Sequence, residues 1–242
     1  MKKSFLLTVL IALTCPAPVV AADDQPDLSR WQCRFCPFEK GLDGSLGLGF
    51  GLAFDDAYRF GSGTGLDDDG AYLLGDMSLT WWGEDARFYE LDASKLGTSA
   101  RSLSLRGGVQ GRYTFDFIYD ELPYRYNNSG ATPFLGIGGS NLTLPTGWQT
   151  AGSTRLMPDL SASLRPFAIG QDRKNFGLGL KFLRGDRWTH EISYSRSSRN
   201  GIGPHSGNFL TLSSILPAPI DYETDTFMAA VGYTATRWQA RL

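Results

Sequence analysis

The segment SLSLRGGVQGRYTFDFIYDELPYRY, residues Ser102–Tyr126, decides the fold of this chain. From Ser102 to Asp120 the odd-numbered positions are apolar, aromatic or glycine, and most of the even-numbered positions are polar or charged. A period of two predicts extended chain, because successive side chains of a strand point to opposite faces. We expect the segment to bend into a hairpin, either at Gly107-Gly108 or near Gly111.

The face formed by the even positions is strongly charged, whereas the opposite face is apolar and has tyrosines near its ends. A soluble β-sandwich would also alternate, but this contrast, repeated along the chain, favours a transmembrane β-barrel. In such a barrel the charged side chains face the lumen. The residues predicted to line it are Arg106, Arg112, Asp116, Asp120, Lys181 and Glu191.

The same alternation predicts further strands before and after this segment. The predicted strands lie at 41–55, 71–82, 87–94, 176–182, 188–195 and from residue 226 onward. Long polar connections are predicted at Asn127–Arg165 and at Ser197–Tyr222, which contains three prolines, with a Gly- and Asp-rich loop at Tyr58–Gly70. The sequence therefore predicts an all-β fold: an antiparallel transmembrane barrel over residues 41–242, with eight or nine strands of a larger wall.

Aromatic residues gather near the predicted strand ends. In a membrane barrel such residues form belts at the level of the lipid headgroups. The residues predicted to form these belts are Trp81, Trp82, Tyr119, Tyr124, Trp188 and Tyr194.

The N-terminus reads as a secretory signal peptide over residues 1–22. Lys2 and Lys3 provide the charged start, Phe5–Leu13 the apolar core, and Val19–Ala22 a small-residue cleavage region. Removing it would shift the formal charge of the 242-residue chain from −2 to about −4. This balance offers no basic field to attract nucleic acid. Since no later run of about 18 apolar residues occurs, we expect the chain to cross the membrane with strands.

Residues 23–40 form a predicted N-terminal arm that contains Cys33-x-x-Cys36. Covalent haem attachment would require His directly after the second cysteine, where Pro37 stands. Three interpretations stay open: a disulfide or structural pair, thiols that are redox-active or contact a partner, and a metal site. A zinc site would need further ligands, and the two histidines, His190 and His205, are far away in the sequence.

The remaining motifs do not indicate catalysis. The chain has no Gly-x-Ser-x-Gly elbow, and its two histidines do not suggest a triad. We therefore expect no enzyme and no metal site, with a thiol-disulfide enzyme using Cys33 and Cys36 as a minor alternative.

Several motifs together resemble the MtrB/PioB family of decahaem-associated outer-membrane barrels. They are the Trp-x-Cys-x-x-Cys-Pro arm at 31–37, Gly111-Arg112-Tyr113, the segment Tyr119–Tyr124, Leu144-Pro145 and the segment Leu216–Tyr222. The resemblance covers most of the mature chain. Members of the family are much longer barrels, so the chain resembles an N-terminal portion or a truncated relative.

The resemblance implies a sheath in the outer membrane of a Gram-negative bacterium. Such a barrel would house a periplasmic decahaem c-type cytochrome and position it against an extracellular multihaem cytochrome, so that electrons cross the membrane. The haem would be carried by the partner, with none bound covalently to this chain. Cys33 and Cys36 match the N-terminal cysteine pair of the family. The alternative is a diffusion porin or small outer-membrane barrel without a cytochrome.

The assignment of faces can be tested by placing a charge on each. Arginine at Leu105 or Phe115 is expected to cost about 2–4 kcal/mol, because it would put a charge in lipid near the bilayer midplane. Arginine at Ser104 or Thr114 is expected to cost much less. Unfolding titrations in lipid vesicles measure both, and equal tolerance of the two sets would refute the assignment.

Overall fold

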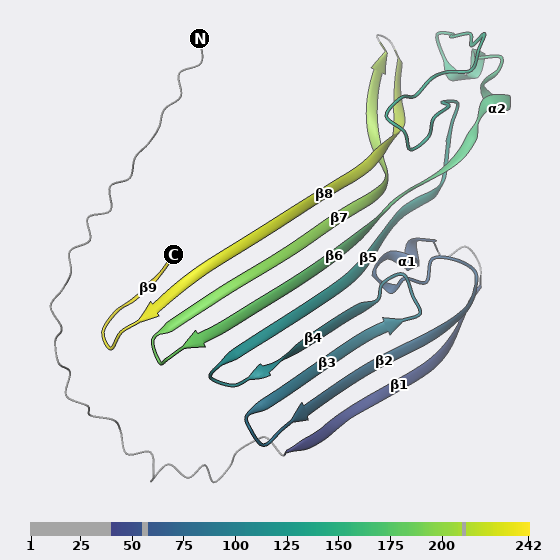
Figure 1. The fold of residues 1–242 in the computed structure, drawn as a ribbon. Helices are drawn as coiled ribbons and strands as arrows, with labels where there is room; N and C mark the ends of the chain where they lie inside the picture. Colours follow the sequence, from purple (N-terminus) through teal and green to yellow (C-terminus); the bar gives the residue numbers. More distant parts are fainter. Residues whose placement is uncertain (1–39, 55–57, 210–211) are drawn as a thin grey trace, which may run out of the picture. The chain divides into compact units, whose positions relative to one another are not determined.

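The computed structural model describes residues 40–54, 58–209 and 212–242, all within one structural unit, Phe38–Leu242. The predicted signal peptide and most of the arm, including Cys33 and Cys36, lie outside the described residues. The described part forms one antiparallel sheet in the order β1 to β9, in which every strand pairs with its neighbours in sequence (Figure 1). The predicted antiparallel all-β architecture is confirmed.

Strands β5 to β8 are about twice as long as β3 and β4. The strands are β1 Gly41–Ala53, β2 Gly70–Trp82, β3 Arg87–Leu96, β4 Ser102–Val109, β5 Tyr113–Thr132, β6 Arg165–Arg184, β7 Trp188–Phe209, β8 Leu212–Thr234 and β9 Gln239–Arg241. Short helical turns occur at η2 Tyr58–Phe60, α1 Gly61–Thr64, η3 Thr154–Leu156 and α2 Leu160–Ser163. No helix among the described residues is long and apolar enough to cross a membrane.

The sheet has two different ends. The turns β2–β3, β4–β5, β6–β7 and β8–β9 are short and lie at the end where β1 begins. The longest connections, 54–69 between β1 and β2 and 133–164 between β5 and β6, lie at the opposite end (Figure 1). We call these the short-turn end and the long-loop end.

The β4–β5 hairpin bends at Gln110–Arg112, so the predicted bend near Gly111 is correct and the one at Gly107-Gly108 is wrong. Gly111 has a φ of +75°, and the amide of Arg112 donates to the carbonyl of Val109 at 3.0 Å. A three-residue hairpin loop needs a left-handed residue here, which glycine adopts without steric cost. Val109 pairs with Tyr113, so the two lie on the same face, and because the turn has three residues the odd-numbered positions stay on that face in β5.

The register keeps one face of the sheet apolar from β1 to β8. Leu105 pairs with Leu91 and with Phe117, and the row continues through Leu178, Tyr194 and Phe227. Many of these side chains lie open: Leu48 is 73% exposed, Phe50 70% and Phe227 70%. Within the described residues no second layer covers this face, which distinguishes the fold from a soluble sandwich.

The prediction of a long loop at Ser197–Tyr222 is wrong, because β7 and β8 continue through it as a paired ribbon. Pro204 pairs with Pro217, and Ile202 pairs with Pro219, two positions along. Both pairs therefore belong to the same alternate set of the antiparallel ladder, the set whose N–H groups point away from the partner strand. β6 stops pairing at Ile202, and β9 pairs with β8 only at residues 232–234, so no ladder bond is lost at these prolines.

The predicted connection at Asn127–Arg165 is shorter than expected at both ends. β5 continues to Thr132 and β6 begins at Arg165, which leaves 133–164 as the connection. The ladder between the two strands shifts register between Arg125 and Gly130. Such irregularities accommodate the polar, Gly-containing end of β5. From the sequence pattern alone, this end was predicted to be a loop.

The β1–β2 connection fills the space beyond the short β3–β4 hairpin and reaches β5. Arg125 of β5 holds it there, with Nε 2.6 Å from Oδ2 of Asp67 and Nη1 2.7 Å from Oδ1 of Asp172. The hydroxyl of Ser62 donates to the carbonyl of Arg125 at 2.9 Å, and the Arg125 side chain is only 12% exposed. The predicted Tyr58–Gly70 loop is therefore packed and contains η2 and α1.

Replacing Arg125 with methionine is expected to release this connection. It would leave Asp67, a mostly buried carboxylate, without its cation, a loss of about 3 kcal/mol in local stability. Hydrogen exchange of the amides of residues 58–69 measures the effect. Arg59→Met, which removes an exposed guanidinium from the same connection, is the control, and equal exchange in the two variants would show that Arg125 is not the anchor.

Candidate functional site

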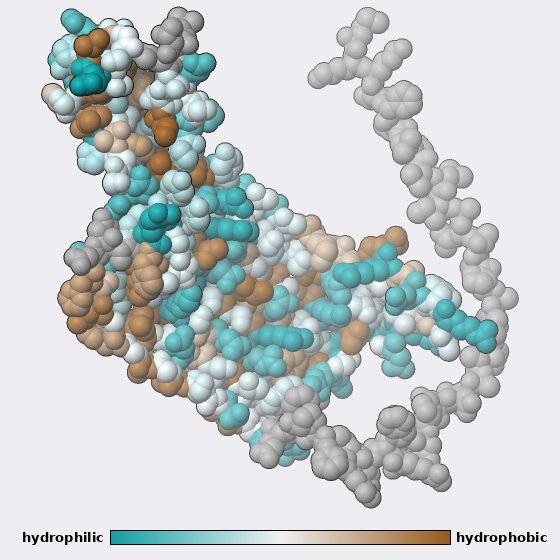
Figure 2. Space-filling view, turned by 180° about the vertical axis from the view of Figure 1, so that it is seen from behind, coloured by the Kyte–Doolittle hydropathy of each residue, from teal (hydrophilic) through white to brown (hydrophobic). Residues whose placement is uncertain are grey.

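The face opposite the apolar one is built mainly from small and polar residues. Ser104 pairs with Asp92 and Ile118, and the face continues through Gly177, Ser195 and Thr226. Figure 2 shows hydrophilic residues and residues of intermediate hydropathy over much of the sheet as seen from behind, with hydrophobic residues gathered on the β1–β2 side. We call this the polar face.

Several glycines of the polar face are not required by the fold. A Cβ at Gly47 or Gly49 would come no closer than 3.7 Å or 3.5 Å to another residue, and one at Gly177 no closer than 3.9 Å. These contacts are ordinary, and none of the three glycines has a left-handed φ. What the missing side chains provide is space above the sheet.

Three of the predicted lumen residues lie together on β4 and β5. Arg106 pairs directly with Asp116, and Asp120 pairs with Ser102 on the same face. The carboxylate of Asp116 lies over Gly179, where a Cβ would be 2.3 Å from Oδ1. The glycine therefore gives this carboxylate its place close to the sheet.

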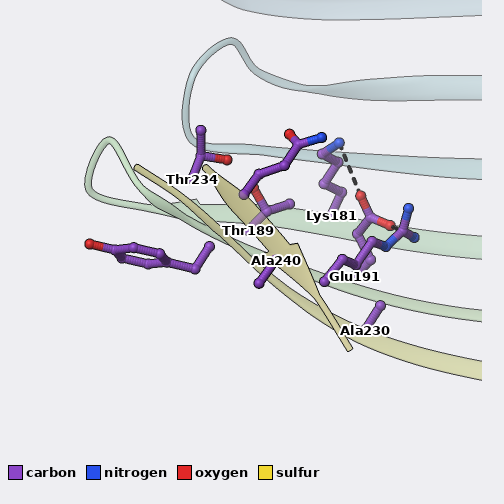
Figure 3. Close-up of a pocket in the computed structure, with 10 residues that line it drawn as sticks. Lys181, Thr189, Glu191, Ala230, Thr234 and Ala240 are labelled. Carbon is purple, nitrogen blue, oxygen red and sulfur yellow. Dashed lines mark hydrogen bonds and ion pairs between the residues drawn. The ribbon is translucent and has the colours of Figure 1, made fainter. Parts of the chain in front are cut away.

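Two more predicted lumen residues form an ion-paired group on β6 and β7. Nζ of Lys181 lies 3.0 Å from Oε1 of Glu191, and the guanidinium of Arg241 on β9 pairs with the same carboxylate. They border a hollow of about 390 Å³ together with Thr189, Ala230 and Thr234 (Figure 3). Sequence reasoning missed Arg241, although Arg241 and Gln239 lie two residues apart and therefore point to the same face.

Arg112 lies in the β4–β5 turn and not on a strand, so its predicted place in the alternating pattern is wrong. The alternation in the sequence continues through the turn without a break, because an odd number of turn residues keeps the odd positions on one face. The turn residue Arg112 was therefore read as a strand residue. The other five predicted lumen residues share the polar face. That this face lines a lumen stays a prediction.

Four of the six predicted belt aromatics lie on the apolar face. Trp81 and Trp188 lie at the short-turn end, and Tyr119 and Tyr194 lie six strand positions or more towards the other end. The prediction is wrong for Trp82 and Tyr124, which the register places on the polar face. Neighbouring residues of one strand point to opposite faces, so Trp81 and Trp82 cannot share a belt.

Trp82 instead stacks on Phe88 on the polar face. Their ring centroids are 5.3 Å apart with 22° between planes, and the guanidinium of Arg106 lies over the Phe88 ring at 5.9 Å. Phe88 is one of the few buried apolar side chains of the described residues. The sequence pattern does not indicate this cluster, because its two aromatic residues occupy strand positions at which the alternation predicts polar residues.

On the apolar face, charged residues appear beyond the aromatic rows towards the long-loop end. Arg101 donates to both oxygens of Glu121, which raises the pKa of this guanidinium. Farther along, burial raises the pKa of the Tyr58 phenol, which lies near Arg125 in the packed β1–β2 connection. These groups bound the apolar band on that side.

The polar face thus combines open glycine positions with polar and charged side chains, an arrangement suited to contact a large polar surface. Its described residues do not bring an acid, a base and a nucleophile into hydrogen-bond contact. Among the residues that the structure describes, no three His, Cys, Asp or Glu side chains are grouped to hold a metal ion. His190 lies on the apolar face, stacked on Phe182 with centroids 4.6 Å apart.

Comparisons with known proteins identify what the chain is similar to. Residues 53–242 match the MtrB/PioB outer membrane beta-barrel porin family. The chain is 31% identical over 247 aligned residues to outer membrane protein MtrB of Shewanella baltica (strain OS185). The alignment covers 98% of this chain and 35% of that relative, so the chain spans about a third of its length.

The open space at the glycines predicts opposite effects of alanine at two positions of β1. Gly49→Ala is expected to leave stability unchanged or raise it by about 0.5–1 kcal/mol, because alanine loses less backbone entropy. Gly44→Ala is expected to destabilise, because its Cβ would meet the Ser78 carbonyl at 2.4 Å. Urea unfolding in vesicles measures both, and a destabilising Gly49→Ala would show that the fold itself requires this glycine.

Proposed function

Because this chain belongs to the MtrB/PioB family of outer-membrane β-barrel porins, we propose that its polar face forms part of the inner wall of a sheath around a periplasmic multihaem c-type cytochrome. The protein is located in the outer membrane of a Gram-negative bacterium, and its apolar face is the one that meets lipid. The sheath would insulate the haem chain from lipid and position it for electron transfer across the membrane.

The observation that supports this proposal is the open space along the polar face. Gly47, Gly49 and Gly177 leave space that the fold does not need, and serines and threonines occupy many neighbouring positions. A folded protein can approach such a wall closely along its length.

The charges of the wall also suit contact with a protein. Lys181 and Arg241 share the carboxylate of Glu191, so the group carries one net positive charge, which an acidic group of a partner would neutralise. Trp82 and Arg106 offer residue types that recur at the energetic centres of protein interfaces. The haem iron of the partner would perform the redox chemistry, and this chain would perform no catalysis.

The proposal gives the arm a role at the periplasmic end. Outer-membrane barrels have short periplasmic turns and longer extracellular loops, so the short-turn end is periplasmic. β1 begins at this end with Gly41, so the proposed arm would join the barrel on the periplasmic side. We propose that Cys33 and Cys36 act at the contact with the cytochrome. An extracellular cytochrome would be met at the long-loop end.

Filling the open space should weaken the assembly without unfolding the barrel. In Gly49→Leu and Gly177→Leu the added side chains would stand above the wall, and we expect at least a tenfold loss of retained cytochrome, the effect of about 1.4 kcal/mol. The measurement is the haem absorbance that co-purifies with the detergent-extracted protein from its host. Ala229→Leu adds bulk to the opposite face and is the control.

The outcome separates the sheath from the alternative. If the wild-type protein carries no haem while forming open pores in planar bilayers, the chain functions as a diffusion porin. Equal haem in wild type, Gly49→Leu and Gly177→Leu would also contradict contact at this wall.

Replacing Cys33 with alanine tests the arm separately. We expect the barrel to insert normally and the amount of retained cytochrome to fall, because the substituted residue lies before the first strand. Heat-modifiable gel mobility measures insertion, and haem absorbance measures assembly. Loss of the inserted barrel itself would indicate that the cysteine pair is structural.

A further inference from the structure

The lipid-facing side of the sheet changes from aromatic to cationic within one row at the long-loop end. Tyr119 of β5 pairs with Leu103 and Phe176, which form the last apolar row on β4 to β6. In the next row on the same face, Glu121 pairs with Lys174, and its amide donates to the carbonyl of Arg101 at 2.9 Å. Arg101, Glu121 and Lys174 therefore stand side by side immediately above the aromatic level.

A buried carboxylate holds the two cations in place. Nε and Nη2 of Arg101 lie 3.0 Å and 3.2 Å from the two oxygens of Glu121, and Nζ of Lys174 lies 3.6 Å from Oε1. The hydroxyl of Tyr119 donates to the same carboxylate. The Glu121 side chain is only 7% exposed, whereas those of Arg101 and Lys174 are 50% and 54% exposed.

This arrangement leaves donors for a second anion. Arg101 uses one edge of its guanidinium on Glu121, so Nη1 remains, and an ammonium group has three donors of which the carboxylate engages one at most. The group of three carries one net positive charge. Arginine and lysine held together in this way are suited to a phosphate group, which accepts several charge-assisted hydrogen bonds.

Its place in the membrane identifies the kind of phosphate. The group lies on the apolar face, directly beyond the aromatic row, at the end whose long connections mark the extracellular side. A phosphate at this height on a lipid-facing surface belongs to the headgroup of an outer-leaflet lipid. We propose that Arg101 and Lys174, positioned by Glu121, bind a phosphate of lipid A, the phosphorylated glycolipid of the outer leaflet. This site goes beyond the proposed sheath and does not depend on a cytochrome.

The neighbouring ion-paired group on the same face differs in charge. Arg196 lies 2.7 Å from Asp225 and 2.9 Å from Glu223, so two carboxylates share one cation. That group carries one net negative charge and should repel a phosphate. Of these two groups, only the one on β4 to β6 carries a net positive charge.

The test compares lipid A binding by the full chain and by a double variant, Arg101→Gln with Lys174→Gln. Native mass spectrometry of the detergent-solubilised protein, titrated with bisphosphorylated or dephosphorylated lipid A, measures the affinity. The double variant Arg184→Gln with Arg187→Gln makes the same change in charge at the short-turn end and is the control. Heat-modifiable gel mobility verifies that each variant is folded.

We expect the wild type and the control to bind bisphosphorylated lipid A alike, and Arg101→Gln/Lys174→Gln to bind it at least tenfold more weakly, the effect of losing charge-assisted hydrogen bonds. Dephosphorylated lipid A should bind weakly to all three. Equal binding by both double variants, or equal binding of the two lipids by the wild type, would overturn the proposal. So would displacement of lipid A by millimolar inorganic phosphate, because the site would then recognise free phosphate instead of a lipid headgroup.

Discussion

The register of the antiparallel ladder is the constraint on which the rest of the structure depends. Each strand from β4 to β8 keeps its apolar parity opposite the apolar parity of its neighbours, with Leu105 opposite Phe117 and Leu180 opposite Ile192. A slip of one residue in any pair would turn a whole strand over and place its charges among the apolar rows. The turn at Gln110–Arg112 protects this register, because an even number of turn residues would reverse the parity of β5.

This register gives a single-layered sheet with one apolar face. Such a sheet can be stable without a second protein layer only if a membrane covers that face. In water its apolar face would need a second layer, and large side chains such as Leu48 and Phe227 lie open in the described residues. Lipid provides that layer, which explains how a sheet with few buried apolar side chains can be stable. The ends of the apolar band are marked by aromatic rows, and at the long-loop end Arg101, Lys174 and their carboxylate follow at once. The polar face is then free for the partner proposed above, and its open glycines are the observation that supports that proposal.

Sequence reasoning predicted the faces well where the alternation is strict. Between Ser102 and Asp120 the pattern located the strands, one of the two proposed bends and the shared face of Arg106 and Asp116. It failed at Ser197–Tyr222, where prolines suggested a loop although their missing N–H groups fall at ladder positions that need none. It also failed for Trp82 and Tyr124, because residue type was allowed to outweigh parity. The pairing of Arg241 with Glu191 depends on where β9 folds back, which local pattern does not specify.

The measurement that tests this account most directly is the accessibility of spin labels placed singly at residues 113–120 of β5, in protein reconstituted in lipid vesicles. The account predicts that collisions with oxygen peak at odd positions and collisions with a water-soluble nickel complex peak at even positions, with a period of two. Equal accessibility to the nickel complex at both sets, or a period near 3.6, would contradict a sheet with one face in lipid and the other in water.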